Sequence, residues 1–244
     1  MEKLKKSYTI SSFQIDSNAR LRIHSLFNLF QDIADEHAEK IGVGYSFCRE
    51  NGVGWVGAAY HLKIQRLPLW NDKIRIETWP SASTAASAIR DFQVFDSDEN
   101  EIIKATSQWV LIDTTRMRPI PIAKHLPHYT IIDERVLASD FAKIPDPEGP
   151  FDSIVFPVHT DDIDLNNHVN NALYPTWILD AFDDSFLKKH TPAEIKILFR
   201  RSAKRGDKVL LKTYRNGLET FSLLMNADNA IEFARVQINW QEQK

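Results

Sequence analysis

The stretch DIDLNNHVNN, residues 162–171, holds two aspartates, four asparagines and one histidine. Within it, Asp164, Asn166 and His168 stand at alternate positions, and in an extended segment such positions lie on one side. Histidine transfers protons near neutral pH. An asparagine amide donates to a developing oxyanion or accepts from a water, and an aspartate can fix the histidine tautomer and orient the asparagine. The spacing therefore predicts a converging group suited to acyl transfer, next to the N-terminus of a helix that favours negative charge.

A polar turn that leads into a capped helix explains many of the same residues. Aspartate and asparagine gather at turns and helix starts because their side chains bind nearby backbone groups. This alternative accounts for Asn170 or Asn171, and it does not call for three polar groups at alternate positions. A metal site made from His159, Asp161 and His168 is the weaker competitor, since no paired-ligand spacing supports it. From spacing alone, the catalytic and the turn interpretations both stay open.

Composition narrows the class of protein. The 244 residues carry a net charge of -3, which provides no basic surplus for binding nucleic acid. Cys48 is the single cysteine, so neither a disulfide framework nor a thiolate metal site is expected. No apolar run is long enough to cross a bilayer, and the N-terminal MEKLKKSYTI lacks the apolar core of a secretory signal. We expect a cytoplasmic protein without membrane insertion.

Most of the chain is predicted as strand, interrupted by two long helices. The first, within residues 25–42, has Ser25 as its expected N-cap and Gly42 as its stop. The second covers residues 171–189, with Pro175 near its first turn, where proline is best tolerated. Four predicted strands follow each helix, and a further short helix is expected within 131–142. This order of elements predicts an α+β protein.

The two halves of the chain resemble each other. IDSNARLRI (15–23) matches IDLNNHVNN (163–171), and NDKIRIETW (71–79) matches GDKVLLKTY (206–214). The first half has Arg20 where the second has His168, as expected for one degenerate and one working copy of a duplicated unit. The proline-rich stretch between the halves indicates a linker. We therefore expect an N-terminal unit over 1–138, a linker over 139–152 and a C-terminal catalytic unit over 153–244.

Two segments resemble the acyl-ACP thioesterases, which release fatty acids from acyl carrier protein. DLNNHVNNALYPTWILD (164–180) is similar to the family's catalytic segment, and LPLWNDKIRIETWP (67–80) to one of its strands. The resemblance implies a tandem hotdog fold, with two long central helices wrapped by antiparallel sheet. It also implies Asp164, Asn166 and His168 as the catalytic group, an acyl-chain pocket in the N-terminal unit, acyl carrier protein as partner, and no metal or organic cofactor.

One position departs from the family pattern. Family members often carry a glutamate two residues after the position of Arg200, where this chain has Ser202, followed by Ala203 in place of a cysteine found in plant enzymes. Ser202 would contribute only a hydrogen bond, and it is a weak candidate for substrate binding. Trp55 is the other weak candidate, as a wall of the acyl pocket, although such aromatic residues are more often plain core. The segment RRSAKR (200–205) around Ser202 is basic. Its charge suits binding of an acidic carrier protein, and it is equally typical of the solvated end of a strand.

Three functions remain open from the sequence. The first is hydrolysis of acyl-ACP to free fatty acid and holo-ACP in fatty acid biosynthesis. The second is hydrolysis of acyl-CoA by the same site, because the residues themselves do not show the carrier. The third is a non-catalytic acyl-binding protein, which Ser202 favours and the trio Asp164, Asn166 and His168 opposes. A tandem pair already contains the pairing that single-hotdog proteins achieve by dimerising, so both a monomer and a homodimer fit the sequence.

Overall fold

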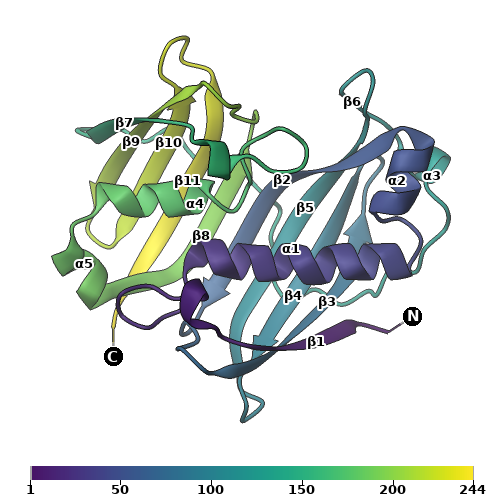
Figure 1. The fold of residues 1–244 in the computed structure, drawn as a ribbon, viewed down its shortest axis with the longest axis horizontal. Helices are drawn as coiled ribbons and strands as arrows, with labels where there is room; N and C mark the ends of the chain where they lie inside the picture. Colours follow the sequence, from purple (N-terminus) through teal and green to yellow (C-terminus); the bar gives the residue numbers. More distant parts are fainter. Residues whose placement is uncertain (1, 244) are drawn as a thin grey trace. The chain divides into compact units, whose positions relative to one another are not determined.

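The computed structural model describes residues 2–243 and divides into two compact units, Met1–Asp140 and Phe141–Lys244. Each unit is an antiparallel sheet with a helical segment on one face (Figure 1). The α+β class predicted from the order of elements is confirmed. Among the described residues, no helix is long and apolar enough to span a membrane.

The sheet of the first unit has the strand order β1-β3-β4-β5-β2, with the short strand β6 paired to β5. Its long helix α1 crosses one face of this sheet (Figure 1). The four strands predicted after the first helix are present as β2 to β5, because alternating and continuous apolar runs are local signals. The elements are β1 (Leu4–Thr9), η1 (Ser12–Gln14), α1 (Ile23–Lys40), α2 (Tyr45–Asn51), β2 (Val53–Ile64), β3 (Lys73–Ser83), β4 (Ser87–Phe95), β5 (Glu101–Asp113), β6 (Arg118–Pro119) and α3 (Ile122–His125).

Helix α1 buries the apolar face that its periodicity predicts. Leu26, Phe30 and Ile33 are fully enclosed, and the Phe30 ring stacks on Phe92 of β4 with 4.6 Å between ring centroids. The expected N-cap is wrong: the helix starts two residues before Ser25, which is itself buried inside the first turn. The expected stop is confirmed, because Gly42 follows the helix with a φ of 76° that favours glycine.

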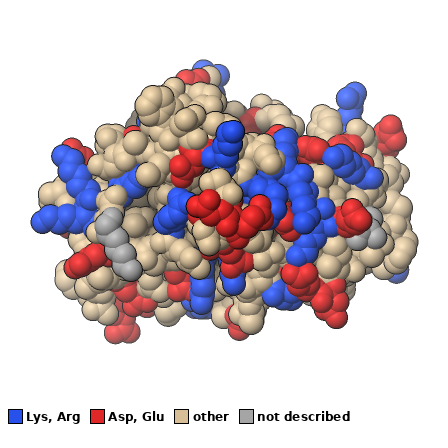
Figure 2. All heavy atoms as spheres, turned by 90° about the horizontal axis from the view of Figure 1, so that it is seen from below, with Lys and Arg blue, Asp and Glu red and all other residues tan. Residues whose placement is uncertain are grey.

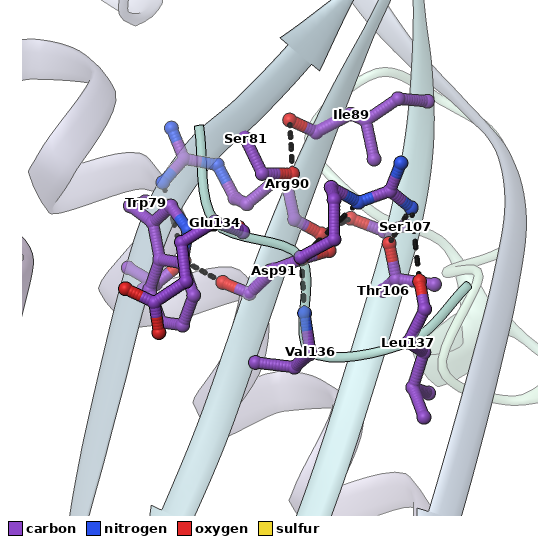
Figure 3. Close-up of polar contacts among 12 residues, drawn as sticks. Trp79, Ser81, Ile89, Arg90, Asp91, Thr106, Ser107, Glu134, Val136 and Leu137 are labelled. Carbon is purple, nitrogen blue, oxygen red and sulfur yellow. Dashed lines mark hydrogen bonds and ion pairs between the residues drawn. The ribbon is translucent and has the colours of Figure 1, made fainter. Parts of the chain in front are cut away.

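Both faces of strand β4 are covered. Ser87–Phe92 are all buried, whereas a strand with one solvated face would alternate. Helix α1 covers one face, and the segment 132–137 crosses the other (Figure 3). There the Val136 N–H donates to a carboxylate oxygen of Asp91 at 2.9 Å, and the Trp79 indole N–H donates to the Glu134 carbonyl at 2.8 Å. This extended segment stands where a short helix was expected within 131–142, so that prediction is wrong.

The sheet of the second unit has the strand order β7-β9-β10-β11-β8. This matches the first unit strand for strand, since β1, β3, β4, β5 and β2 take the same places there. A shared order of five strands supports duplication of one ancestral unit. The elements are β7 (Asp152–Pro157), η2 (Thr160–Asp162), α4 (Tyr174–Trp177), η3 (Ile178–Ala181), α5 (Asp184–Lys189), β8 (His190–Phe199), β9 (Lys208–Asn216), β10 (Glu219–Asn226) and β11 (Glu232–Glu242).

The prediction of a second long helix over residues 171–189 is wrong. The segment breaks into three short pieces, α4, η3 and α5. The break falls at Phe182, whose backbone is extended, and at Asp183, whose carboxylate accepts from the Phe186 N–H at 2.8 Å and starts α5. A local aspartate cap thus outweighs the helical periodicity around it. Trp177, Ile178 and Phe182 are still buried, and the Trp177 and Phe182 rings contact Phe156 of β7 and Trp240 of β11.

Between α3 and β7 the chain forms neither helix nor strand. Its first part is tied to the first unit, as the Ile132 N–H donates to the Pro80 carbonyl at 3.0 Å. Its last part is tied to the second unit, where Arg235 donates to the Ile144 carbonyl at 3.1 Å and to Asp146 at 2.5 Å. The connection is therefore anchored at both ends by named contacts.

Candidate active site

Residues 164–168 form a tight turn. The Asp164 carboxylate accepts from the backbone N–H of Asn166 at 2.8 Å and of His168 at 3.3 Å. The Asp164 N–H donates back to the His168 carbonyl at 2.8 Å, and Asn167 takes a φ of 60° at the tip. The flanking residues Ile163 and Val169 pair as an antiparallel bridge. The expected extended segment is therefore wrong, because the same alternation of Asp, Asn and His also satisfies an aspartate-stabilised turn.

The turn brings the three candidate residues together in a way that spacing did not predict. Asp164 is half-buried and acts on the backbone, so it sets the positions of Asn166 and His168 through their amide groups. Asn166 is exposed at the turn, and His168 is partly buried at its end. The amide and the imidazole are thus presented by a loop whose shape the aspartate maintains.

The first unit contains a loop with the same pattern of backbone hydrogen bonds. Asp16 accepts from the N–H groups of Asn18 at 2.8 Å and Arg20 at 2.9 Å, and Ala19 takes a φ of 59°. Ile15 and Leu21 form the matching bridge. The loop geometry is therefore common to the duplicated unit.

The difference lies in the last residue of the loop. Arg20 is buried, and its guanidinium pairs with Asp16 at 3.1 Å. An arginine stays protonated at any physiological pH, so it does not serve as a proton-transfer base. The chemistry that His168 offers is absent from the first loop, although the shape remains.

The Ser202–Ala203 segment is hydrogen-bonded to the residues that follow the 164–168 turn. The Val169 N–H donates to the Ala203 carbonyl, and the Ala203 N–H donates to the Tyr174 hydroxyl, both at 2.9 Å. Ala203 and Tyr174 are buried, while Ser202 is exposed. Burial, together with the charges of Asp207 and Asp164, raises the pKa of Tyr174 to about 12, so its hydroxyl stays neutral. Tyr174 therefore holds the Ser202–Ala203 segment beside the residue that follows His168.

The expected contribution of a helix N-terminus is small here. Helix α4 has only four residues, so few peptide dipoles align along it. The turn before it is closed by Asn170, whose side chain accepts from the Ala172 N–H at 2.9 Å. This agrees with the structural role expected for Asn170 or Asn171.

Trp55, the weak candidate for an acyl-chain wall, lines a pocket that lies within the first unit. Its indole N–H donates to the Val43 carbonyl at 3.0 Å, which fixes the ring. The pocket is an open hollow, and the about 490 Å³ of space inside it includes solvent at its mouth. Its walls come from the end of α1, the loop after it, strands β2 to β5 and the chain after α3, and they consist of Ala34, Asp35, Ala38, Ile41, Val43, Trp55, Pro80, Ala88, Ile89, Arg90, Trp109 and Tyr129.

No group of three His, Cys, Asp or Glu side chains within residues 2–243 is arranged to hold a metal ion. The set His159, Asp161 and His168 considered from the sequence is thus not gathered into a ligand cluster. All basic residues on either side of the Ser202–Ala203 segment are exposed, namely Arg200, Arg201, Lys204 and Arg205. Figure 2 shows both basic and acidic side chains on the face that it draws.

Comparison with known proteins places these features in one family. The model of the acyl-ACP thioesterase N-terminal domain matches residues 1–129, and that of the C-terminal domain matches residues 149–242. The chain belongs to the acyl-ACP thioesterase family. The resemblance inferred from residues 67–80 and 164–180 is confirmed.

Two relatives in this family are plant proteins. The chain is 27% identical over 225 residues to oleoyl-acyl carrier protein thioesterase 1 of Arabidopsis thaliana, and 30% identical over 220 residues to palmitoyl-acyl carrier protein thioesterase of Gossypium hirsutum, both chloroplastic. Each match includes 84% of this chain, which spans 62% and 53% of the lengths of these relatives.

Solved structures of the acyl-ACP thioesterase family share the whole fold. The 12:0-ACP thioesterase from Umbellularia californica superposes with a TM-score of 0.85 at 22% identity, over 99% of this chain and 98% of that one. A putative oleoyl thioesterase from Lactobacillus plantarum gives a TM-score of 0.82 at 21% identity, over 100% and 97%. The predicted tandem hotdog fold is confirmed, apart from the broken second helix.

Sequence reasoning missed two features of this family member. Tyr174 lies within a motif whose pattern gives it no separate role, and its hydrogen bond to Ala203 joins positions 29 apart. The contact between His37 of α1 and Arg90 of β4 joins positions 53 apart. A histidine on an otherwise apolar helical face and an arginine in an apolar strand were the available signals, since buried polar side chains need partners.

Proposed function

We propose that this protein hydrolyses the thioester of acyl-ACP, releasing a free fatty acid and holo-ACP. The observation that carries the proposal is the Asp164-centred turn, which holds Asn166 and His168 in a chain whose two halves match the two domains of one thioesterase family. Plant relatives named as acyl-ACP thioesterases and hydrolases support the substrate class.

In this mechanism, His168 removes a proton from the attacking water as its oxygen bonds to the thioester carbonyl carbon. The carbon–sulfur bond then breaks, and the imidazolium returns a proton to the leaving thiolate. Asn166 donates to the carbonyl oxygen or orients the water, and Asp164 keeps both residues in place through the turn. Ser202 stands where relatives in the family often have a glutamate, so it offers a hydrogen bond and no base to the water.

The first unit would provide the acyl-chain pocket, with Trp55 as one of its walls. Exposed Arg200, Arg201, Lys204 and Arg205 suit an acidic carrier protein, since complementary charge speeds encounter between partners. The division into an acyl-binding unit over 1–138, a linker over 139–152 and a catalytic unit over 153–244 is part of this proposal. So are a cytoplasmic location and the option of a homodimer, which cell fractionation and light scattering test directly.

The deciding experiment measures thiol release from matched acyl-ACP and acyl-CoA substrates by wild-type protein and by His168→Ala. We expect hydrolysis of acyl-ACP, and a fall of roughly 100-fold or more in the variant, the usual contribution of a positioned base. His159→Ala is the matched control, because it removes an exposed histidine nine positions earlier. It should keep the wild-type rate.

Two outcomes would change the assignment. Hydrolysis of acyl-CoA alone would keep the site and replace the carrier. Binding of acyl chains without hydrolysis of either substrate would contradict the assignment as an enzyme and support a non-catalytic acyl-binding protein. Ser202 and Ala203 would then be the substitutions that explain the loss of activity.

A further inference from the structure

The pocket of the first unit has a charged group in its wall. Arg90 is 9% exposed and lies on the α1 side of strand β4, opposite the face on which Asp91 binds the 132–137 segment (Figure 3). Most of the remaining wall is apolar. A plain hydrocarbon chain gains nothing from a guanidinium, and an unpaired charge is costly to bury beside one.

The partners of Arg90 are neutral. One guanidinium nitrogen, Nη1, donates to Nδ1 of His37 at 3.0 Å and to the Thr78 hydroxyl at 3.2 Å. Burial is the main cause that lowers the pKa of His37 to about 4, so this imidazole carries no charge near neutral pH. Burial also lowers the pKa of Arg90, to about 10, which leaves the guanidinium protonated at the same pH.

Within residues 2–243, no carboxylate forms a direct ion pair with Arg90. Asp35 lines the same pocket and attracts Arg90 electrostatically, but its carboxylate accepts from the Gln31 side chain at 2.7 Å and makes no hydrogen bond to the guanidinium. Among residues 2–243, His37 and Thr78 are the only side chains that accept from the Arg90 guanidinium. Its Nε and Nη2 groups keep their hydrogen-bonding capacity, and neither is a fully enclosed polar atom.

We propose that the pocket holds an acyl chain that carries an oxygen acceptor along its length, and that the Nε and Nη2 groups of Arg90 bind this oxygen. A hydroxyl, a keto group and a distal carboxylate share the required chemistry. The inference names the substrate class of the proposed function. The binding tests below are independent of that function, and the test with thioesters rests on it. Asp35 and Tyr129 are further polar residues of the same wall.

The first test is binding, which does not depend on hydrolysis. Free saturated fatty acids are titrated against the full chain by calorimetry, each beside hydroxy, keto and dicarboxylic acids of the same length. At least one oxygenated class should bind about tenfold or more tightly than its saturated parent, the scale of a hydrogen bond to a charged group. Equal or weaker binding of all three classes would overturn the proposal, and the preferred class identifies the oxygen.

The second test assigns the preference to Arg90. In Arg90→Met the ratio of the two binding constants should fall close to one, while Arg118→Met, a surface change in the same unit, should keep it. Arg90→Lys retains the charge and should keep part of the preference, which covers the case in which the methionine variant does not fold. A preference that survives in both Arg90 variants would overturn the assignment.

The third test uses ACP thioesters of the same chains. A higher kcat/KM for the oxygenated thioester supports both proposals. Hydrolysis of all thioesters at equal rates, with equal binding, removes the substrate class and leaves the proposed function. Preferential binding of oxygenated acids without any hydrolysis keeps the pocket assignment and removes the proposed function.

Discussion

Asp164 and Asp16 make the same contacts and differ in what their loops carry. Each carboxylate accepts from two backbone N–H groups of its own loop. Such a bond resembles a helix cap, whose loss costs about 1–2 kcal/mol. The pair therefore allows the structural part of an aspartate substitution to be measured separately from the chemical part.

We expect Asp164→Ala to lower both the free energy of unfolding, by about 1–2 kcal/mol, and the rate of thioester hydrolysis. Asp16→Ala also removes the ion pair with buried Arg20, so it should destabilise the protein at least as much while the rate is retained. Denaturant unfolding and steady-state kinetics of both variants check this. An equal loss of rate in Asp16→Ala would mean that destabilisation alone explains the effect at Asp164.

His37 links stability to pH. Burial beside Arg90 lowers its pKa to about 4, from an ordinary value of 6.5, because the charged imidazole is poorly solvated there. The unfolded chain therefore takes up this proton below about pH 6.5, and the folded chain only below about pH 4. The stability due to neutral His37 is complete above the first pH and is lost as the pH falls towards the second, by about 3 kcal/mol in all.

The measurement compares the unfolding free energies of wild type and His37→Gln from about pH 7 to pH 4. Glutamine keeps an acceptor for Arg90 and does not titrate. The stability of the variant relative to wild type should rise as the pH falls, while acid effects at other carboxylates cancel in the comparison. A constant difference across this range would show that His37 titrates normally.

At the scale of elements, Tyr174 joins α4 to the segment after β8. Its hydroxyl is the acceptor for the buried Ala203 N–H, so Tyr174→Phe leaves that donor without its partner. We expect a loss of about 1–3 kcal/mol in unfolding free energy and a lower kcat. Circular dichroism melts and kinetics measure both effects, and Tyr214→Phe, on β9 of the same unit, is the control. An unchanged kcat would show that the position of the Ser202–Ala203 segment does not affect turnover.

The elements that could be predicted from the sequence are those that depend on local pattern. Helix α1 follows from its apolar periodicity, and the strands follow from their apolar runs. The helix over 171–189 failed because Asp183 provides a competing cap within a periodic stretch. The extended form of residues 164–168 failed for a related reason, since alternating side-chain types do not distinguish a strand from a turn.

The features of the candidate site also differ in how far the sequence predicts them. Asp164, Asn166 and His168 lie in one loop, which follows from their spacing, and their catalytic role stays a prediction. The contacts Tyr174–Ala203 and His37–Arg90 were not predictable, since each depends on how distant elements pack. Long-range contacts of this kind require the fold before they can be stated.

At the scale of the whole molecule, the connection between α3 and β7 is held in each unit by a different charged residue. In the first unit Asp91 is fully buried, and one of its oxygens binds both the Val136 N–H and the Arg135 guanidinium. In the second unit Arg235 binds Ile144 and Asp146. The connection is therefore expected to resist proteases along most of its length.

Asp91→Ala should release the first anchor and speed tryptic cleavage after Arg135, which mass spectrometry locates. Asp98→Ala, in an exposed turn of the same unit, is the control and should leave cleavage unchanged. Cleavage after Lys143, close to the second anchor, should not increase in either variant. Similar cleavage rates after Arg135 in wild type and Asp91→Ala would show that other contacts hold the segment.

The two aspartate-centred loops also bear on the history of the chain. Their carboxylates bind backbone amides, which are present whatever side chain stands four positions later. Selection for a folded unit therefore preserves the aspartate, whereas only selection for activity preserves a histidine after it. After a duplication, one loop is free of that second demand, and the loop with Arg20 shows that the shape does not require a histidine.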